Sequence, residues 1–220
     1  MRHGYTNTTR RMPGAVLKTY AGPDSSLRLD NERQALRALA GRYPVPEILN
    51  EGPDSLLLGF VPGEHGQDLI DAGHAEEVLR ACGLALRALH SIDITTVFPR
   101  SATREHVLTH GDFGPNNVLL DPGTFEVTAV LDWEFSAPGD AVVDVAWCEW
   151  IVRMHHPGAV TALSAFHAAY GSVSPWPMRQ AAMISRCQWL QDFCKRSDPN
   201  GGGAALWQDR GFATARWTEH

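Results

Sequence analysis

A polar loop followed by two short apolar segments constrains the fold of this chain more than any other feature. The loop begins at residue 110 and reads HGDFGPNN, and the apolar segments that follow span residues 118–120 and 127–131. Apolar runs separated by turn residues predict the two strands of a hairpin. Such a hairpin would hold the side chains of Asp112, Asn117 and Asp132 around one point.

The spacing of these three polar residues suits phosphoryl transfer. That reaction needs a carboxylate to orient the attacking hydroxyl and accept its proton, and oxygen ligands for Mg²⁺ on the nucleotide phosphates. Asp112 suits the first role, and Asn117 and Asp132 suit the second. Asp and Asn are also common turn residues. The coincidence of HxD, an Asn at the right offset and two apolar segments closed by Asp nevertheless favours the catalytic interpretation.

The segment resembles the aminoglycoside phosphotransferase family, the small-molecule branch of the kinase-like fold. That family commonly has HGDxxxxN in its loop and a bulky aromatic after its metal-binding Asp, as in Asp132-Trp133. It continues with Gly-Asp and a further Asp, similar to Gly139-Asp140 and Asp144. The resemblance covers residues 4–150. It implies a protein-kinase-like two-lobed fold and Mg²⁺-assisted phosphoryl transfer from ATP (or GTP) to a hydroxyl of a small molecule.

The order of elements predicts an α+β fold, with strands early in the chain and helices later. A break at Pro62-Gly63 predicts a small β-rich nucleotide-binding lobe over residues 1–61 and a larger, mostly helical catalytic and substrate lobe over residues 62–220. Early strands are expected at 15–20, 45–49 and 55–61. Helices are expected at 31–40 with Asp30 as N-cap, and at 74–91, 141–155, 160–170, 177–196 and 204–215.

The resemblance also assigns the nucleotide half. Lys18, in a VLK context, corresponds to the lysine that binds the α- and β-phosphates, and Glu32 to the glutamate that holds it. The segment around Gly59 and Val61 resembles the strand between the lobes, so the Gly59 carbonyl and the Val61 N–H are the candidates for adenine binding. A plain solvent-facing Lys and a plain buried strand are the alternatives.

The phosphate-covering loop departs from the kinase pattern because no GxGxxG is present. The sequence GYTNT at residues 4–8 resembles the substitute that the family uses, which places Thr6 and Asn7 on the phosphates. Three residues precede Gly4, so we expect an N-terminally shortened lobe. We also expect residues 4–9 to be a mobile loop that becomes ordered when nucleotide binds.

The second half of the chain lacks the long activation segment and the APE motif that protein kinases use to bind a peptide. Its absence predicts a small acceptor, cationic or sugar-like, because several acidic residues could line its pocket. A structural role is the alternative for each of them, and for Asp144 that role is to cap a helix or to brace the catalytic loop. The tryptophans could stack on the acceptor, although packing in the core is the commoner role. The acidic candidates are Glu134, Asp140, Asp144, Glu149, Asp192 and Asp209, and the tryptophans are Trp147, Trp150, Trp176, Trp189 and Trp207.

Composition excludes some classes of function. The net charge is −6 and the pI is about 5.9, which argues against nucleic acid as a partner. No run is apolar enough to span a membrane and no signal peptide is evident, so a cytoplasmic enzyme without an obligate protein partner is expected. The four cysteines lack CxxC spacing and are expected to be buried reduced thiols.

Two rival functions stay open at this point. A pseudokinase of the same fold would bind nucleotide without turnover, which an ATP-turnover assay would reveal. A metal-dependent phosphohydrolase would use His110, Asp112 and Asp132 and would cleave phosphate esters without ATP.

Overall fold

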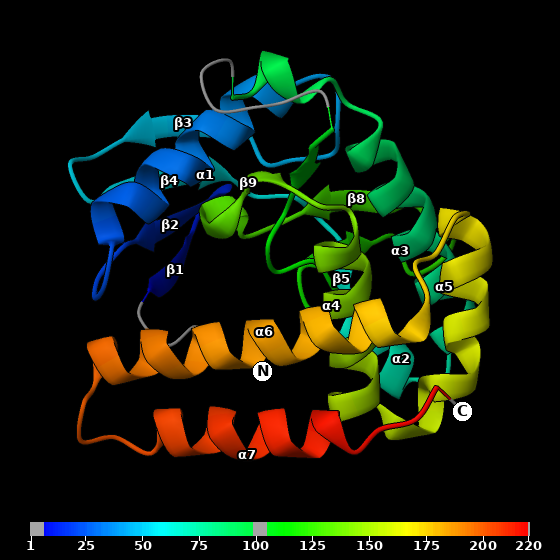
Figure 1. The fold of residues 1–220 in the computed structure, drawn as a ribbon. Coiled ribbons are helices and arrows are strands. Elements are labelled where there is room, and N and C mark those ends of the chain that lie inside the picture. Colours follow the sequence, from blue (N-terminus) through cyan, green and yellow to red (C-terminus); the bar gives the residue numbers. More distant parts are fainter. Residues whose placement is uncertain (1–6, 99–104, 220) are drawn as a thin grey trace.

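The computed structural model describes residues 7–98 and 105–219, and it combines a strand-rich part with a larger helical part (Figure 1). The strand-rich part is a four-stranded antiparallel sheet in the order β1-β2-β4-β3. Helix α1 packs beside this sheet, as expected for an α+β fold. Its elements are β1 (Thr8–Met12), β2 (Ala15–Thr19), α1 (Ser25–Leu39), β3 (Ile48–Glu51) and β4 (Ser55–Gly59).

The helical part follows β4 and contains two small sheets, β5-β7-β8 and β6-β9. The strands and short helices are β5 (Glu64–His65), η1 (Ile94–Thr96), β6 (Val107–Thr109), β7 (Val118–Leu120), β8 (Val127–Val130), η2 (Trp133–Phe135), β9 (Ala137–Gly139) and η3 (Pro157–Ala162). The helices are α2 (Gly66–Asp71), α3 (Ala75–His90), α4 (Val142–His155), α5 (Leu163–Tyr170), α6 (Trp176–Ser197) and α7 (Gly203–Ala215). The β7-β8 pair is the predicted hairpin.

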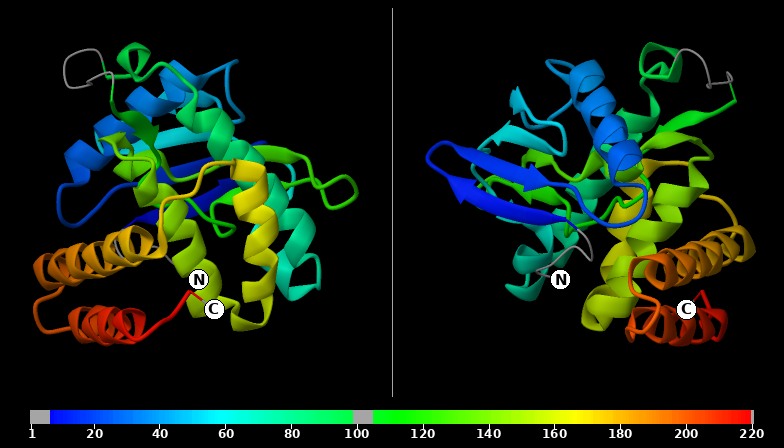
Figure 2. Two further views of the ribbon diagram at one scale, coloured as in Figure 1. Left: turned by 45° about the vertical axis from the view of Figure 1, so that its right-hand side comes forward. Right: turned by 90° about the vertical axis from the view of Figure 1, so that its left-hand side faces the viewer.

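Two hydrophobic clusters hold these elements together. The larger one joins α1 and α3 to β7, β8, α4 and α5. The smaller one lies between α4, α6 and α7 and is built around Trp147, Trp150 and Trp207. Figure 2 shows α6 and α7 running antiparallel, side by side, along one edge of the molecule. All four cysteines are buried and free, as predicted.

Helix α1 begins at Ser25, six residues before its expected start. Asp30 is therefore not an N-cap but an interior residue that pairs with Arg33 on the helix surface. The added turns place Leu29 in the core and bury Arg28 against Glu134. These tertiary contacts extend the helix beyond the point where local capping signals would start it.

The expectation of a loop over residues 4–9 is wrong for its last two residues. Thr8 and Thr9 belong to β1 and pair with Thr19 and Lys18 of β2. The strand is exposed along its length, so no apolar pattern marks it in the sequence. In the described part of the chain, no helix is both long and apolar enough to cross a membrane.

Candidate active site

The polar loop between β6 and β7 is held by backbone contacts that its sequence makes possible. Gly111 has φ of +81°, and a Cβ atom there would lie 2.4 Å from the carbonyl oxygen of Phe135. Only glycine fits this left-handed, crowded position. Asp144 from α4 accepts hydrogen bonds from the backbone N–H groups of His110, at 2.7 Å, and Gly111, at 2.8 Å. Asp144 therefore braces the catalytic loop.

His110 is fully buried and has a structural role. Its Nδ1 lies 3.2 Å from the backbone N–H of Asp112, and its Nε2 lies 2.9 Å from the carbonyl oxygen of Leu131. Nδ1 must accept and Nε2 must donate, which fixes the tautomer. Both ring nitrogens are therefore engaged by the backbone, so His110 is not available as a ligand for the metal of a phosphohydrolase.

The Asp112 carboxylate is held on both sides by side chains of the protein. Its Oδ1 accepts a hydrogen bond from the indole N–H of Trp147 at 2.7 Å, and its Oδ2 accepts one from Asn117 Nδ2 at 3.0 Å. Burial raises the pKa of Asp112, although Arg186 acts in the opposite direction. A raised pKa makes this carboxylate a stronger base than an exposed Asp.

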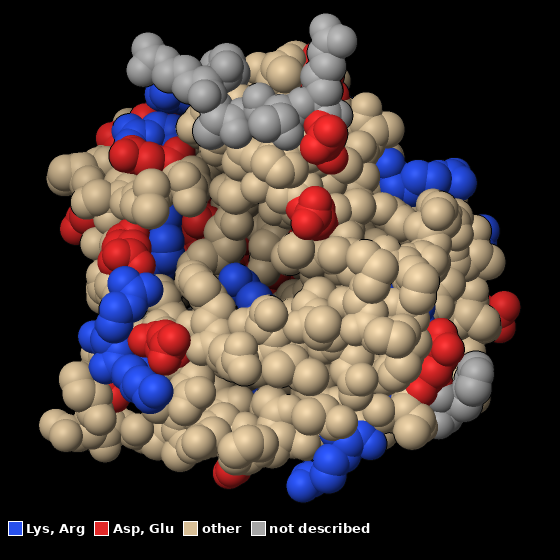
Figure 3. All heavy atoms as spheres, viewed as in Figure 1, with Lys and Arg blue, Asp and Glu red and all other residues tan. Residues whose placement is uncertain are grey.

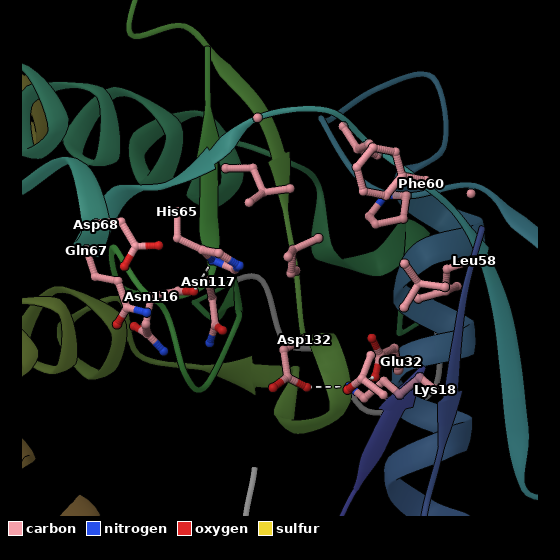
Figure 4. A pocket seen from close by; sticks show the side chains of 18 residues that line it. Lys18, Glu32, Leu58, Phe60, His65, Gln67, Asp68, Asn116, Asn117 and Asp132 are labelled. Atoms are coloured by element: carbon pink, nitrogen blue, oxygen red, sulfur yellow. Dashed lines mark hydrogen bonds and ion pairs between the residues drawn. The ribbon is translucent and has the colours of Figure 1, made fainter. Parts of the chain in front are cut away.

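Asn117 and Asp132 line a cavity of about 570 Å³ together with Lys18, Glu32, Gly59 and Val61. Figure 4 shows Asp132 facing Lys18, with Asn117 nearby on the neighbouring loop. Asn117 uses its Nδ2 for two hydrogen bonds to Asp112, which leaves its Oδ1 as an oxygen donor. The structure therefore brings all these predicted nucleotide and metal residues to one cavity.

Lys18 is buried among three carboxylates. Its Nζ contacts Glu32 at 2.5 Å, Glu134 at 3.8 Å, and Asp132. Burial tends to lower the pKa of Lys18, but these carboxylates outweigh it and raise the pKa well above its usual range. Lys18 in turn holds the pKa of Asp132 below its usual value, in spite of burial. The predicted Lys18–Glu32 pair is thus formed.

Glu134 has a second cation partner, Arg28, whose Nη1 lies 2.9 Å from Glu134 Oε2. Burial and the nearby Asp132 nevertheless raise the pKa of Glu134 to about 7. Asn7 joins this cluster, donating to Glu134 and accepting from Arg28. Asn7 does not line the cavity, so the structure does not place its side chain on a bound phosphate. Thr6 lies outside the described residues.

The titration of Glu134 predicts a pH-dependent stability. A folded-state pKa raised from 4.5 to about 7 means that folding favours the protonated form. Stability from this group is present at acidic pH and is lost as the pH rises through about 7. Glu134→Gln should remove this dependence and stabilise the nucleotide-free protein at pH 8.5 by roughly 3 kcal/mol. Urea unfolding at pH 5.5 and 8.5 checks this, and an undiminished slope in the variant would contradict it.

The acidic pocket expected for a cationic acceptor is not assembled from the buried candidates. Glu134 pairs with Arg28, Asp144 with His90 and the catalytic loop, and Glu149 with Arg153 and Arg179. Asp140, Asp192 and Asp209 are exposed. Sequence reasoning did not select Arg28, which contacts Glu134, or Arg186, which lies close enough to Asp112 for the two charges to interact, and it did not foresee the contact of Trp147 with Asp112.

The tryptophans follow the commoner expectation in part. Trp147, Trp150 and Trp207 are buried in the smaller core cluster, with Trp147 and Trp150 stacked at 4.4 Å between ring centroids. Trp189 is 38% exposed and Trp176 is half-buried. Trp147 packs in the core, as in the commoner expectation, and in addition its indole N–H donates a hydrogen bond to Asp112.

The fold is similar to that of solved aminoglycoside phosphotransferases. The structure of aminoglycoside phosphotransferase APH(4)-Ia matches with a TM-score of 0.72 and 20% identity, covering 98% of this chain and 92% of that one. The gentamicin complex of APH(2")-IIa matches with a TM-score of 0.70 and 13% identity, covering 98% and 90%. These matches confirm the protein-kinase-like fold.

Relatives with curated names match over shorter stretches. Acyl-CoA dehydrogenase family member 10 of Mus musculus is 25% identical over 177 residues, which cover 56% of this chain and 17% of that protein. Hygromycin-B 4-O-kinase of Escherichia coli is 45% identical over 51 residues, which cover 21% of this chain and 14% of that protein. Aminoglycoside 3'-phosphotransferase of Streptomyces fradiae is 47% identical over 47 residues, which cover 21% of this chain and 18% of that protein. The chain thus spans less than a fifth of the length of each of these relatives.

A model of the phosphotransferase enzyme family matches residues 2–106 and 98–183, a span that includes the cavity, the catalytic loop and the brace from Asp144. The match takes in most of the chain and agrees with both the fold and the arrangement of Asp112, Asn117 and Asp132. The chain belongs to the phosphotransferase enzyme family.

Proposed function

We propose that this protein transfers the γ-phosphate of ATP to a hydroxyl of a small molecule. The observation that carries the proposal is the convergence of Asp112, Asn117 and Asp132 beside a cavity that also holds the Lys18–Glu32 pair. This arrangement supplies the parts that phosphoryl transfer requires, namely a base, oxygen ligands for a cation and a phosphate-binding lysine. The relatives named as kinases of hygromycin B and aminoglycosides support the same class of reaction.

Asp112 is the base in this proposal. The acceptor hydroxyl gives its proton to the Asp112 carboxylate while its oxygen forms a bond to the γ-phosphorus, and the bond from that phosphorus to the leaving oxygen of ADP breaks. Trp147 and Asn117 fix the orientation of the carboxylate. A carboxylate oxygen has a further lone pair for the acceptor O–H after accepting one hydrogen bond.

Lys18 holds the nucleotide phosphates. Lys18 contacts both Glu32 and Asp132, and we propose that it would bind the α- and β-phosphates with Glu32 holding it in place. The carboxylate of Asp132 and the free Oδ1 of Asn117 are hard oxygen donors, which fits magnesium. These two residues would hold the cation, which supplies neutralisation of the charge on the phosphates.

The adenine would lie at the other end of the cavity, against Gly59 and Val61. We propose that these residues mark the junction of a nucleotide-binding lobe over residues 1–61 with a catalytic and substrate lobe over residues 62–220. Strand β4 ends at Gly59, and β5 already pairs with β7 of the catalytic part. We place the reaction in the cytoplasm because it consumes ATP.

An ADP-release assay over a panel of small alcohols, sugars, hydroxy acids, amino alcohols and aminoglycosides tests the proposal. We expect turnover with at least one acceptor, dependent on both ATP and Mg²⁺. Nucleotide binding without turnover on any acceptor would favour a pseudokinase instead. Hydrolysis of phosphate esters without ATP would favour a phosphohydrolase.

Substitution of the two proposed metal ligands should show how much each contributes to Mg²⁺ binding. Asp132→Ala should raise the Mg²⁺ concentration for half-maximal activity by at least about tenfold, and Asn117→Ala should raise it less, because a carboxylate binds a hard cation more strongly than an amide does. Titration of nucleotide binding against Mg²⁺ measures both effects. Asp192→Ala, at an exposed position of α6 that does not line the cavity, is a control. An unchanged Mg²⁺ dependence in Asp132→Ala would refute the assignment.

A further inference from the structure

Arg186, on α6, is enclosed by aromatic rings close to the proposed base. The carbon at the centre of its guanidinium lies 4.3 Å from the ring centroid of Trp189, 5.0 Å from that of Phe135 and 5.7 Å from that of Trp147. Figure 3 shows this face of the molecule hollowed above α6, with basic and acidic atoms both visible in the hollow. Rings on several sides hold the planar guanidinium in one orientation.

The guanidinium has donors without acceptors. Its Nε and Nη2 are buried and make no hydrogen bond, and among the described residues no ion pair includes Arg186. The buried cations Lys18, Arg28 and Arg179, by contrast, each contact a carboxylate. Burial lowers the pKa of Arg186, and Asp112 offsets part of that effect. A buried donor pair left unpaired is costly, which calls for a functional explanation.

Arg186 and the nucleotide cavity lie on opposite sides of Asp112. Asn117 donates a hydrogen bond to Asp112 Oδ2 and lines the nucleotide cavity. Trp147 donates a hydrogen bond to the other oxygen, Oδ1, and the guanidinium of Arg186 lies over the ring of Trp147. Arg186 and its three aromatic neighbours do not line that cavity. Arg186 thus lies across the base from the nucleotide, on the side from which an acceptor hydroxyl has to approach.

We propose that Arg186 binds an oxyanion of the acceptor, and that the acceptor is therefore a small hydroxy acid. Nε and Nη2 share one edge of the guanidinium, which matches the two oxygens of a carboxylate or of a phosphate. The buried carboxylates that could have bound an amine are already paired with cations of the protein. Trp189, 38% exposed and stacked over the guanidinium, is the side chain that has to move to admit the acid.

This inference rests on the proposed phosphotransferase function for its catalytic consequence, but the binding site can be tested without turnover. The probes are hydroxy acids, each matched with its neutral and its amino counterpart: D-gluconate with D-glucose and D-glucosamine, and glycerate with glycerol and serinol. Glycerol 3-phosphate separates a phosphate ligand from a carboxylate. Binding is measured by calorimetry in the presence of Mg²⁺ and a non-hydrolysable ATP analogue, and transfer by ADP release.

The variants are Arg186→Met and Arg186→Lys, with Arg196→Met as control. Arg196 lies on the same helix but is half exposed and pairs with Asp24 at the surface. We expect wild type and the control to prefer an acid over its counterparts. Arg186→Met should weaken acid binding and raise its KM by about 100-fold, since it leaves the acid without its partner. Arg186→Lys should recover part of the loss, which a folding defect would not allow.

Several outcomes would overturn the inference while leaving the proposed function standing. The first is turnover on neutral or amino acceptors, together with an unchanged preference for acids. In that case the ratio of kcat/KM for an acid to kcat/KM for its neutral counterpart would be the same in wild type and in Arg186→Met. A fall in kcat for every acceptor with no change in KM is another, because it would assign Arg186 to the transferred phosphoryl group. Failure of every acid in the panel to bind the wild-type protein also overturns it. Acid binding lost in Arg186→Met without phosphoryl transfer would support the site and contradict the proposed function.

Discussion

Replacing Asp112 with alanine is expected to lower kcat by about 10²- to 10⁴-fold, the usual contribution of a positioned general base. Nucleotide affinity should change little, because the cavity is lined by other residues. An interaction made with the reacting hydroxyl is lost mainly from kcat and not from nucleotide binding. Single-turnover ADP formation and calorimetry of nucleotide binding measure the two effects separately.

The pH profile provides a second readout for Asp112. Burial raises its pKa above that of an exposed Asp, so kcat/KM should fall as the pH drops through the raised value and the base becomes protonated. This acidic limb should be missing from the residual activity of Asp112→Ala. Asp192→Ala, an exposed position on α6, is the control. Near wild-type turnover in Asp112→Ala would show that another group accepts the proton.

Replacing Asp144 with alanine is expected to have the largest effect on stability. Its buried carboxylate accepts hydrogen bonds from two backbone N–H groups of the catalytic loop and lies 3.2 Å from His90 Nε2. Removal leaves all three donors without their partner, at a cost of about 3–5 kcal/mol. For a chain of this size the melting temperature should fall by about 6–20 °C. Activity should fall further than stability explains, because the loop that carries Asp112 loses its brace.

Thermal unfolding of Asp144→Ala beside Asp140→Ala tests this expectation, since Asp140 is exposed just before the same helix. The hydrogen bond from His90 holds the pKa of Asp144 below its usual value, in spite of burial. The carboxylate therefore stabilises the fold above pH 3.8, and this stabilisation is lost as the pH falls through the lower folded value. Equal melting temperatures for the two variants at neutral pH would contradict the bracing role.

The part of the site that the sequence predicts is the part encoded locally. Asp112 and Asn117 belong to one loop, and Asp132 follows the strand that pairs with the strand after that loop. Hairpin pairing between neighbouring segments places all three, so their spacing alone is informative. The α3 helix, with its regular apolar face, is likewise found within one residue at each end.

The rest of the site depends on packing between segments that are distant in the sequence. Arg28 reaches Glu134 across 106 positions of sequence, and Trp147 reaches Asp112 across 35. Neither residue carries a local signal for these contacts, because an Arg on a helix is usually solvent-exposed and a Trp is usually core. Arg186 could not be predicted from the sequence for the same reason. Its proposed role rests on two buried N–H groups that make no hydrogen bond, and these are visible only in the folded structure.

The tryptophan contact to Asp112 ties the chemistry to the last helix of the chain. Trp147 stacks on Trp150, whose indole N–H donates to Thr214 of α7 at 2.8 Å, and Trp207 of α7 packs against both rings. The orientation of the base is thus anchored to a helix on the opposite side from the nucleotide. Loosening of α7 on heating would misdirect the proton acceptor while the nucleotide cavity stays intact. Heat inactivation of this protein would then begin as an uncoupling of phosphoryl transfer from nucleotide binding, ahead of global unfolding.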